Sequence, residues 1–143
     1  RNRFFSLLIK NLNAHPIRRA SADRSALRLA SHLLITGNPV LMFPEGTRSL
    51  DGNFLSPKAG LGYLVAHLGC PVVPVFIKGS FEAFPKNGKA MRSVPISVMF
   101  GEPIYFRKTE IDRSRKDFYQ VITQSVMEKI KSASSDPRLS QSH

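Results

Sequence analysis

Residues 40–49 read Val-Leu-Met-Phe-Pro-Glu-Gly-Thr-Arg-Ser, an apolar run followed at once by polar residues. The apolar run at residues 40–43 lies between two prolines and is too short for a helix, so it predicts a buried strand. Pro44 ends that strand because proline has no N–H to donate to a neighbouring strand. The polar residues 45–57 that follow predict a loop at the carboxyl end of the strand.

Helical and extended patterns alternate along the rest of the chain. Apolar residues spaced by three and four predict helices at residues 2–12, 59–68 and 113–132, and a further helix that Ser21 or Asp23 caps and that runs to Thr36. Short apolar runs predict strands at residues 14–17, 72–77 and 96–100, and residues 79–93 predict a long basic loop. Because the strands are continuously apolar, we expect an α/β fold with a largely parallel or mixed central sheet flanked by helices. One domain would cover residues 1–132, followed by a flexible tail at residues 133–143.

The charge balance indicates anionic partners. The 143 residues include 21 Lys and Arg against 10 Asp and Glu, a net charge of +11, which attracts nucleic acid, anionic lipid or phosphorylated small molecules. Hydrophobic residues make up 42%, which is typical of a globular chain. The single cysteine, Cys70, excludes an internal disulfide and a zinc cluster of cysteines, and we expect a buried structural thiol there. No apolar run approaches the ~18 residues that span a bilayer.

The loop after residue 43 carries the side chains best suited to bind a phosphate. In α/β sheets, ligands bind beyond the carboxyl ends of the strands. Gly46 permits close approach of the backbone, Thr47 offers a hydroxyl, and Arg48 offers a fork of donors that matches a phosphate. Lys58 adds a second positive charge, and Glu45 can orient Arg48 or accept a hydrogen bond from a substrate hydroxyl. The same residues also fit a surface turn closed by an Arg48–Glu45 pair.

The stretch Phe-Pro-Glu-Gly-Thr-Arg-Ser at residues 43–49 resembles the third sequence block of the glycerolipid acyltransferases, of the 1-acylglycerol-3-phosphate (lysophosphatidate) type. Other segments resemble neighbouring blocks of the family in order and spacing: residues 16–19 the second block, which ends in an Arg, residues 57–60 the Lys-x-Gly that follows the third block, and residues 70–75 the fourth block. The second block departs from the family pattern at Asn13, where the family has a Gly. The resemblance runs from about residue 13 to residue 79, and residues 96–103 fit the downstream pattern.

The resemblance implies transfer of an acyl group from acyl-CoA or acyl-carrier protein to the free hydroxyl of a lysophospholipid phosphate. It implies that Arg19, Arg48 and Lys58 hold the phosphate of the acceptor, with Gly46 and Thr47 in the same site. Glu45 would shape the site and support catalysis without acting as the base. No metal and no cofactor besides the acyl thioester is expected. Such an enzyme would work at the cytoplasmic face of an anionic membrane.

The family's first block, a His followed five residues later by an Asp, is not found in these 143 residues. The residues five positions after His15, His32 and His67 are Ala20, Gly37 and Val72, and His143 ends the sequence. We expect His32 and His67 on helix surfaces or in helix C-terminal turns, and the missing block upstream of Arg1. The 143 residues alone would then be inactive.

The basic composition also suits two classes of function other than an enzyme. Residues 2–12 place Phe and Leu on one face and Arg and Lys on the other, which also suits a non-enzymatic basic module that binds anionic membrane lipid. The second class is nucleic-acid binding. The sequence has no recognition-helix pattern, no aromatic stacking strand and no zinc-ligand spacing, which argues against this class.

Overall fold

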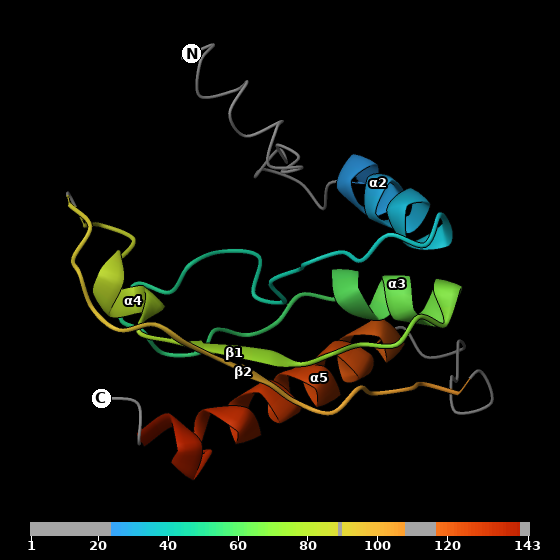
Figure 1. Cartoon of the computed structure of the whole chain (residues 1–143). Coiled ribbons are helices and arrows are strands. Elements are labelled where there is room, and N and C mark those ends of the chain that lie inside the picture. Colours follow the sequence, from blue (N-terminus) through green and yellow to red (C-terminus); the bar gives the residue numbers. More distant parts are fainter. Residues whose placement is uncertain (1–23, 89, 108–116, 141–143) are drawn as a thin grey trace.

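The computed structural model describes residues 24–88, 90–107 and 117–140 (Figure 1). In chain order the elements are α2 (Arg24–Ile35), α3 (Gly60–Leu68), β1 (Val75–Lys78), α4 (Ser80–Ala83), β2 (Ser97–Phe100), α5 (Phe118–Ser134) and a 3-10 turn, η2 (Pro137–Ser140). The helix predicted at residues 2–12 and the strand predicted at residues 14–17 lie outside the described residues.

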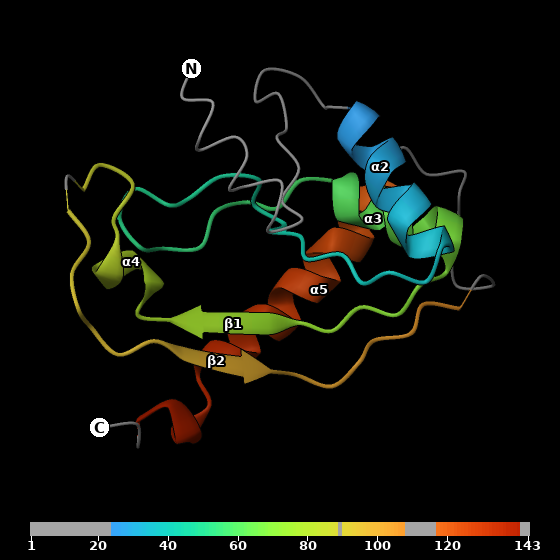
Figure 2. The same cartoon turned by 45° about the horizontal axis from the view of Figure 1, so that its top comes forward.

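The elements form layers around α5. One side of α5 packs against β1 and β2, α3 packs against α5, and α2 packs on α3 (Figures 1 and 2). The core lies between α3 and α5, where Val65, Phe118 and Ile122 are buried together. Farther along α5, Val126 and Met127 are each 1% exposed. The residues at 118, 122 and 126 recur every four positions, so α5 buries one stripe of its surface. Val121 is 51% exposed because it lies outside this stripe.

The N-terminus of α3 is capped by a side chain of α5 and not by a residue next to it in the sequence. Ala59 precedes the helix and offers no side-chain cap. The N–H of Gly62, one of the first four donors without a partner inside the helix, donates instead to Thr123 Oγ1 of α5 at 2.9 Å. The Thr123 hydroxyl in turn donates to the Tyr119 carbonyl at 2.9 Å, and the Thr123 side chain is fully buried. The predicted end of this helix is confirmed, since Gly69 adopts φ +65° and its N–H donates to Val65 O.

The two helices approach each other most closely at Gly62. A Cβ at this position would collide with the backbone carbonyl of Tyr119. Gly62 therefore serves the packing of α3 on α5, and its N–H remains within reach of Thr123.

The strands β1 and β2 pair in antiparallel fashion, with Val75 opposite Phe100 and Lys78 opposite Ser97. The predicted strands at 72–77 and 96–100 are thus found with shifted ends, and Val72 extends the contact by a single bridge to Ile104. A largely parallel sheet is not seen among the described residues. Parallel pairing needs a crossover over the face of the sheet, whereas residues 79–96 turn back beyond the ends of the strands with α4 among them (Figure 2).

The prediction of a strand at residues 40–43 is wrong, because these described residues form no strand. Leu41 is 77% exposed and Phe43 is 63% exposed, and neither belongs to a ladder. An apolar run forms a strand only where a second strand lies beside it, and the ladder here joins β1 and β2.

The chain is also folded beyond the boundary predicted at residue 132. Helix α5 continues to Ser134, and η2 follows at Pro137–Ser140. Leu139 is buried, and its carbonyl accepts a hydrogen bond from Lys78 Nζ at 2.9 Å.

We expect Gly62→Ala to lower the free energy of unfolding by about 1–3 kcal/mol, because the added methyl group pushes α3 away from α5. Gly60→Ala is the matched control, since a Cβ there meets only Leu27 Cδ2 at an ordinary 3.5 Å. Thermal denaturation of both variants measures the difference. Equal melting temperatures for the two variants would contradict the close packing at Gly62.

We expect Thr123→Val to destabilise the protein by about 1–3 kcal/mol, because the buried N–H of Gly62 loses its acceptor while the side chain keeps its shape. Thr123→Ser keeps the hydroxyl and should recover part of the loss. Denaturant titration followed by circular dichroism compares the two variants. A serine variant less stable than the valine variant would show that the hydroxyl does not cap α3.

Candidate functional site

The loop that follows residue 43 is a closed turn. The N–H of Gly46 donates to Phe43 O at 3.0 Å, and the N–H of Lys58 donates to Pro44 O at 2.8 Å. Gly46 adopts φ +69°, a conformation that side chains other than glycine disfavour. Two separate limbs of the loop, at residues 43–46 and at residue 58, are thereby held side by side.

Glu45 braces this loop. Its Oε2 accepts a hydrogen bond from the N–H of Leu55 at 2.8 Å, in a partly buried position. The structure records no bond between Glu45 and Arg48 in this part of the chain. The Arg48–Glu45 pair considered from the sequence is therefore not formed, and Glu45 holds the loop in shape.

Lys58 lies directly against Gly46. A Cβ at Gly46 would come within 3.2 Å of Lys58 Cδ and 3.5 Å of Lys58 Nζ, so the absent side chain leaves room for the lysine. The residue before it is also fixed, because the Pro57 carbonyl accepts a hydrogen bond from Gln120 Nε2 of α5 at 2.7 Å. Gly46 and Lys58, two of the five residues predicted to bind the phosphate, thus lie in contact.

Arg48 is held by the segment that follows α4. Its Nη1 donates to the carbonyl of Phe84 at 3.3 Å, and its guanidinium lies over the Phe84 ring at 5.1 Å from the centroid. Both contacts are with an uncharged residue, so they fix the arginine without cancelling its charge. Phe84 was not predicted as a site residue.

Thr47 receives a hydrogen bond from a lysine that the sequence did not single out. Lys86 Nζ donates to Thr47 Oγ1 at 3.3 Å. The basic loop predicted at residues 79–93 was the sequence signal for Lys86, but nothing in the linear sequence shows that this loop folds onto residue 47.

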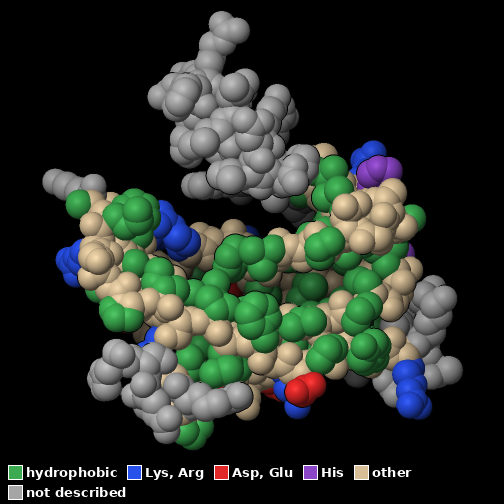
Figure 3. Space-filling model, viewed as in Figure 1, with side chains coloured by type: hydrophobic (Ala, Val, Ile, Leu, Met, Phe, Trp, Pro, Cys, Tyr) green, Lys and Arg blue, Asp and Glu red, His purple; other side chains and the backbone are tan. Residues whose placement is uncertain are grey.

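We refer to Arg48, Lys58 and Lys86 as the cation cluster. Figure 3 shows Lys and Arg side chains beside α4, at one end of a band of hydrophobic side chains.

The far end of the loop is a tight turn of its own. Asp51 Oδ1 accepts hydrogen bonds from Ser49 Oγ at 2.8 Å and from the N–H of Asn53 at 3.0 Å. The Asn53 side chain first, and then Ser49, lower the pKa of Asp51 from 3.8 to about 2. A lowered carboxyl pKa stabilises the fold at every pH above 3.8, and this contribution is lost as the pH falls through about 2. The turn is therefore insensitive to pH in the neutral range.

The remaining predicted residues lie away from this loop or outside the described residues. Arg19, predicted to bind phosphate, falls outside them. His32 and His67 are exposed in the last turns of α2 and α3, as predicted, and His67 Nδ1 lies 2.9 Å from Tyr63 O. Cys70 packs against the core, and burial raises the pKa of its thiol, which disfavours the nucleophilic thiolate.

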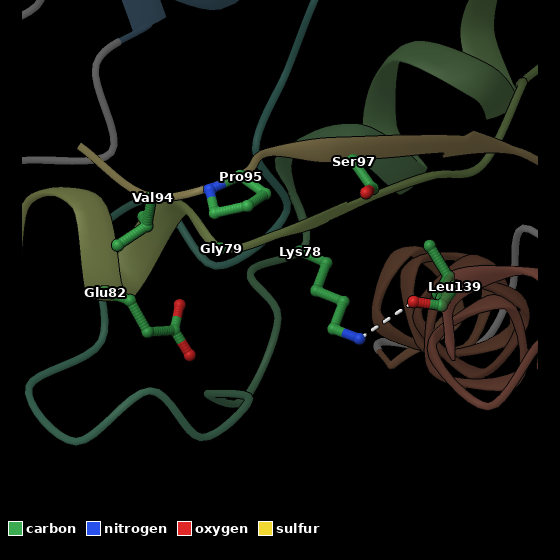
Figure 4. Close-up of a pocket in the computed structure, with 7 residues that line it drawn as sticks. All are labelled: Lys78, Gly79, Glu82, Val94, Pro95, Ser97 and Leu139. Atoms are coloured by element: carbon green, nitrogen blue, oxygen red, sulfur yellow. Dashed lines mark hydrogen bonds between the residues drawn. The ribbon is translucent and has the colours of Figure 1, made fainter. Parts of the chain in front are cut away.

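Neither of two further cavities adds to the loop. One, of about 280 Å³, lies between Lys78, Glu82 and Leu139, and Lys78 points at the Leu139 carbonyl there and not at Glu82 (Figure 4). The other, of about 340 Å³, lies between α2 and α3 beside Arg28 and Tyr63. Among the described residues, no group of three or more His, Cys, Asp or Glu is placed to hold a metal ion. No helix in the same residues is both long enough and apolar enough to cross a membrane.

The sequence is similar to proteins named as acyltransferases. The family model described as Acyltransferase matches residues 1–78. The 1-acyl-sn-glycerol-3-phosphate acyltransferase of Limnanthes douglasii is 38% identical over 74 residues, which cover 52% of this chain and 26% of that protein. The protein of the same name from Cocos nucifera is 37% identical over 85 residues, which cover 59% of this chain and 28% of that protein. The chain thus spans between a quarter and a third of these relatives.

A solved structure shares the fold. The 1-acyl-sn-glycerophosphate (LPA) acyltransferase PlsC from Thermotoga maritima matches with a TM-score of 0.67 and 27% identity. The match covers 92% of this chain and 52% of that chain. The family model covers more than half of the sequence, and its match includes the whole of the loop at residues 43–58. This chain belongs to the Acyltransferase family.

Proposed function

We propose that the protein transfers an acyl group from acyl-CoA or acyl-carrier protein to the free hydroxyl of 1-acylglycerol-3-phosphate, which forms phosphatidate. The observation that carries this proposal is the turn at residues 46–48, where Arg48 and Lys58 flank a backbone opened by the positive φ of Gly46. The relatives named above as 1-acyl-sn-glycerol-3-phosphate acyltransferases support the choice of acceptor.

The turn fits the phosphate of the acceptor by charge and by donor geometry. A phosphate monoester carries close to two negative charges at neutral pH, and about two cationic donors balance it. Arg48 supplies a planar fork and Lys58 a compact ammonium, and both side chains are exposed. Thr47 directly precedes Arg48 in the sequence, and its hydroxyl can donate to a further phosphate oxygen. Arg19 is proposed to bind the same phosphate.

Held by its phosphate, the acceptor presents its hydroxyl to the thioester. The hydroxyl oxygen attacks the thioester carbonyl carbon, a C–O bond forms, the C–S bond breaks, and the leaving thiol takes up the proton that the hydroxyl releases. Orienting the two reactants is itself a source of rate acceleration. The role of the described loop is this orientation, with Glu45 holding the loop through Leu55.

The base that receives the hydroxyl proton is proposed to be the His of a His-x4-Asp block outside these 143 residues. His32 and His67 lie at the ends of helices rather than beside the turn at 46–48. A polypeptide of residues 1–143 alone should therefore show no turnover. We place the full protein at the cytoplasmic face of a membrane, where its positive charge favours an anionic surface.

The exposed apolar side chains of β2 favour a second candidate function. Val98 is 50% exposed and Phe100 is 68% exposed on one face of the strand pair. A non-enzymatic module could use this face, together with the net charge of +11, to bind anionic lipid. Flotation with neutral and anionic liposomes separates the two candidates, because binding without acyl transfer by the full protein supports the module.

We expect Arg48→Ala to lower kcat/KM for lysophosphatidate by about 10- to 100-fold in the full-length protein, because a charge-assisted bond to the phosphate is lost. Arg48→Lys should lose less but not recover fully, since an ammonium cannot form the bidentate contact. Thioester-dependent acylation of lysophosphatidate measures both variants, with Arg107→Ala as the control at an exposed arginine. Absence of turnover by the wild-type protein, or turnover that Arg48→Ala leaves unchanged, would overturn the proposed function.

A further inference from the structure

The segment after α4 forms a second side of the turn at residues 46–48. Phe84 contacts Arg48 through its carbonyl and its ring, and Lys86 contacts Thr47 through its ammonium. These residues lie 36 and 39 positions away from their partners along the chain. Two adjacent residues of the turn, Thr47 and Arg48, are therefore contacted by two nearby residues of one segment. The segment packs against the turn through several contacts and not through a single bond.

The position of Lys86 is set by its own backbone. The N–H of Gly88 donates to Pro85 O at 2.9 Å, which closes a four-residue turn with Lys86 at its first central position. The proline ring before it restricts the chain further, since its φ is fixed. The N–H of Arg92 donates to Ala83 O at 2.7 Å and joins the two ends of the larger loop. Lys86 is thus presented from a constrained loop towards Thr47.

The cation cluster is arranged around three consecutive residues. Lys58 lies against Gly46, Lys86 bonds Thr47, and Arg48 is the third residue itself. The bonds of Lys86 and Arg48 are to a hydroxyl and a carbonyl, so neither positive charge is neutralised by its partner. Arg48 and Lys58 were predicted for the site, and Lys86 was not. With Lys86 the cluster carries three positive charges, which exceeds the roughly two negative charges of one phosphate monoester.

The bond between Lys86 and Thr47 also fixes the direction of the threonine hydroxyl. When Thr47 Oγ1 accepts from the ammonium, its own O–H remains available to donate to another oxygen. An ammonium has three donors, and one bond to Thr47 leaves two of them for a ligand. The pair therefore offers donors from both of its members to the same anion.

We propose that Lys86 is a phosphate-binding residue of this site, and that it contacts the phosphate of the lysophosphatidate acceptor together with Thr47. This assignment rests on the proposed function for the identity of the acceptor. The predicted set of Arg19, Arg48 and Lys58 is thereby extended by a residue from a different segment. Phe84 acts beside it as a positioning residue that holds the Arg48 guanidinium.

Two readouts on the full-length protein test the assignment. In the first, we expect Lys86→Gln to raise KM for lysophosphatidate about five- to tenfold, with kcat changed less than twofold, because the lost bond is made to the phosphate and not to the reacting atoms. Lys86→Arg keeps the charge and should stay within about threefold of the wild-type KM. Lys129→Gln, which removes the same charge from the exposed surface of α5, is the matched control and should leave KM unchanged.

The second readout does not depend on turnover. The unmodified protein is treated with acetic anhydride, and acetylation of each lysine is measured by mass spectrometry. We expect lysophosphatidate to protect Lys86 at least threefold, whereas monoacylglycerol with the same acyl chain should not, because it lacks the phosphate. Lys129 should be acetylated equally in both cases. The acetylation experiment also tests the role of Lys86 if the Lys86→Gln variant fails to fold.

The outcomes separate the two proposals. If the wild-type protein shows no acyl transfer, the proposed function fails, and protection of Lys86 by lysophosphatidate still supports the binding site. If acyl transfer is observed but neither KM nor protection depends on Lys86, the assignment of Lys86 is overturned and the proposed function stands. Protection by coenzyme A and not by lysophosphatidate would assign the phosphate to the donor and would also overturn the proposal.

Discussion

The structure depends on the contact between α3 and α5 at Thr123. One buried hydroxyl satisfies the N–H of Gly62 and the carbonyl of Tyr119, and it does so where the absence of a side chain at Gly62 lets the two backbones meet. A buried N–H without a partner costs more than an ordinary hydrogen bond contributes, so this contact constrains both helices. One turn before Thr123, Gln120 of the same helix holds Pro57.

This arrangement connects the core to the loop at residues 43–58 through a short series of hydrogen bonds. Helix α5 holds Pro57 and the start of α3, Lys58 follows Pro57 directly, and its N–H bonds Pro44 at the other limb of the loop. Glu45 then joins that limb to Leu55. The loop carries exposed charges, but its backbone is tied at several points to buried structure. A rigid scaffold under a polar loop is what a binding site needs in order to keep its donors in place.

The features predicted from the sequence and found in the structure are those with a local cause. The helix at 60–68 ends at Gly69, which adopts the left-handed conformation that such an end favours, and the loop at 45–57 begins at a proline. Gly46 and Lys58, two of the residues predicted for one site, also lie in contact. The family model matches residues 1–78, which confirms the family that the continuous motif at residues 43–49 indicated.

The features that could not be predicted depend on contacts between distant residues. The bond from Lys86 to Thr47 spans 39 positions and that from Gly62 to Thr123 spans 61 positions, and neither pair carries a signal in its neighbourhood. The direction of strand pairing is not encoded in an apolar run, so the antiparallel pair of β1 and β2 was missed. The exposure of Leu41 and Phe43 has the same origin, because hydrophobic character sets a preference for burial but does not supply a partner.

The packing of Lys58 over Gly46 has a consequence for the entropy of binding. A free lysine on a protein surface samples many rotamers, and fixing it costs up to about 2 kcal/mol. Here the methylene groups already lie against the backbone of Gly46, where a Cβ would come within 3.2 Å of Lys58 Cδ. Part of that freedom is therefore lost when the protein folds and not when the ligand arrives. The lysine stem rests on the glycine, so less side-chain entropy would be lost when the proposed phosphate binds to Lys58.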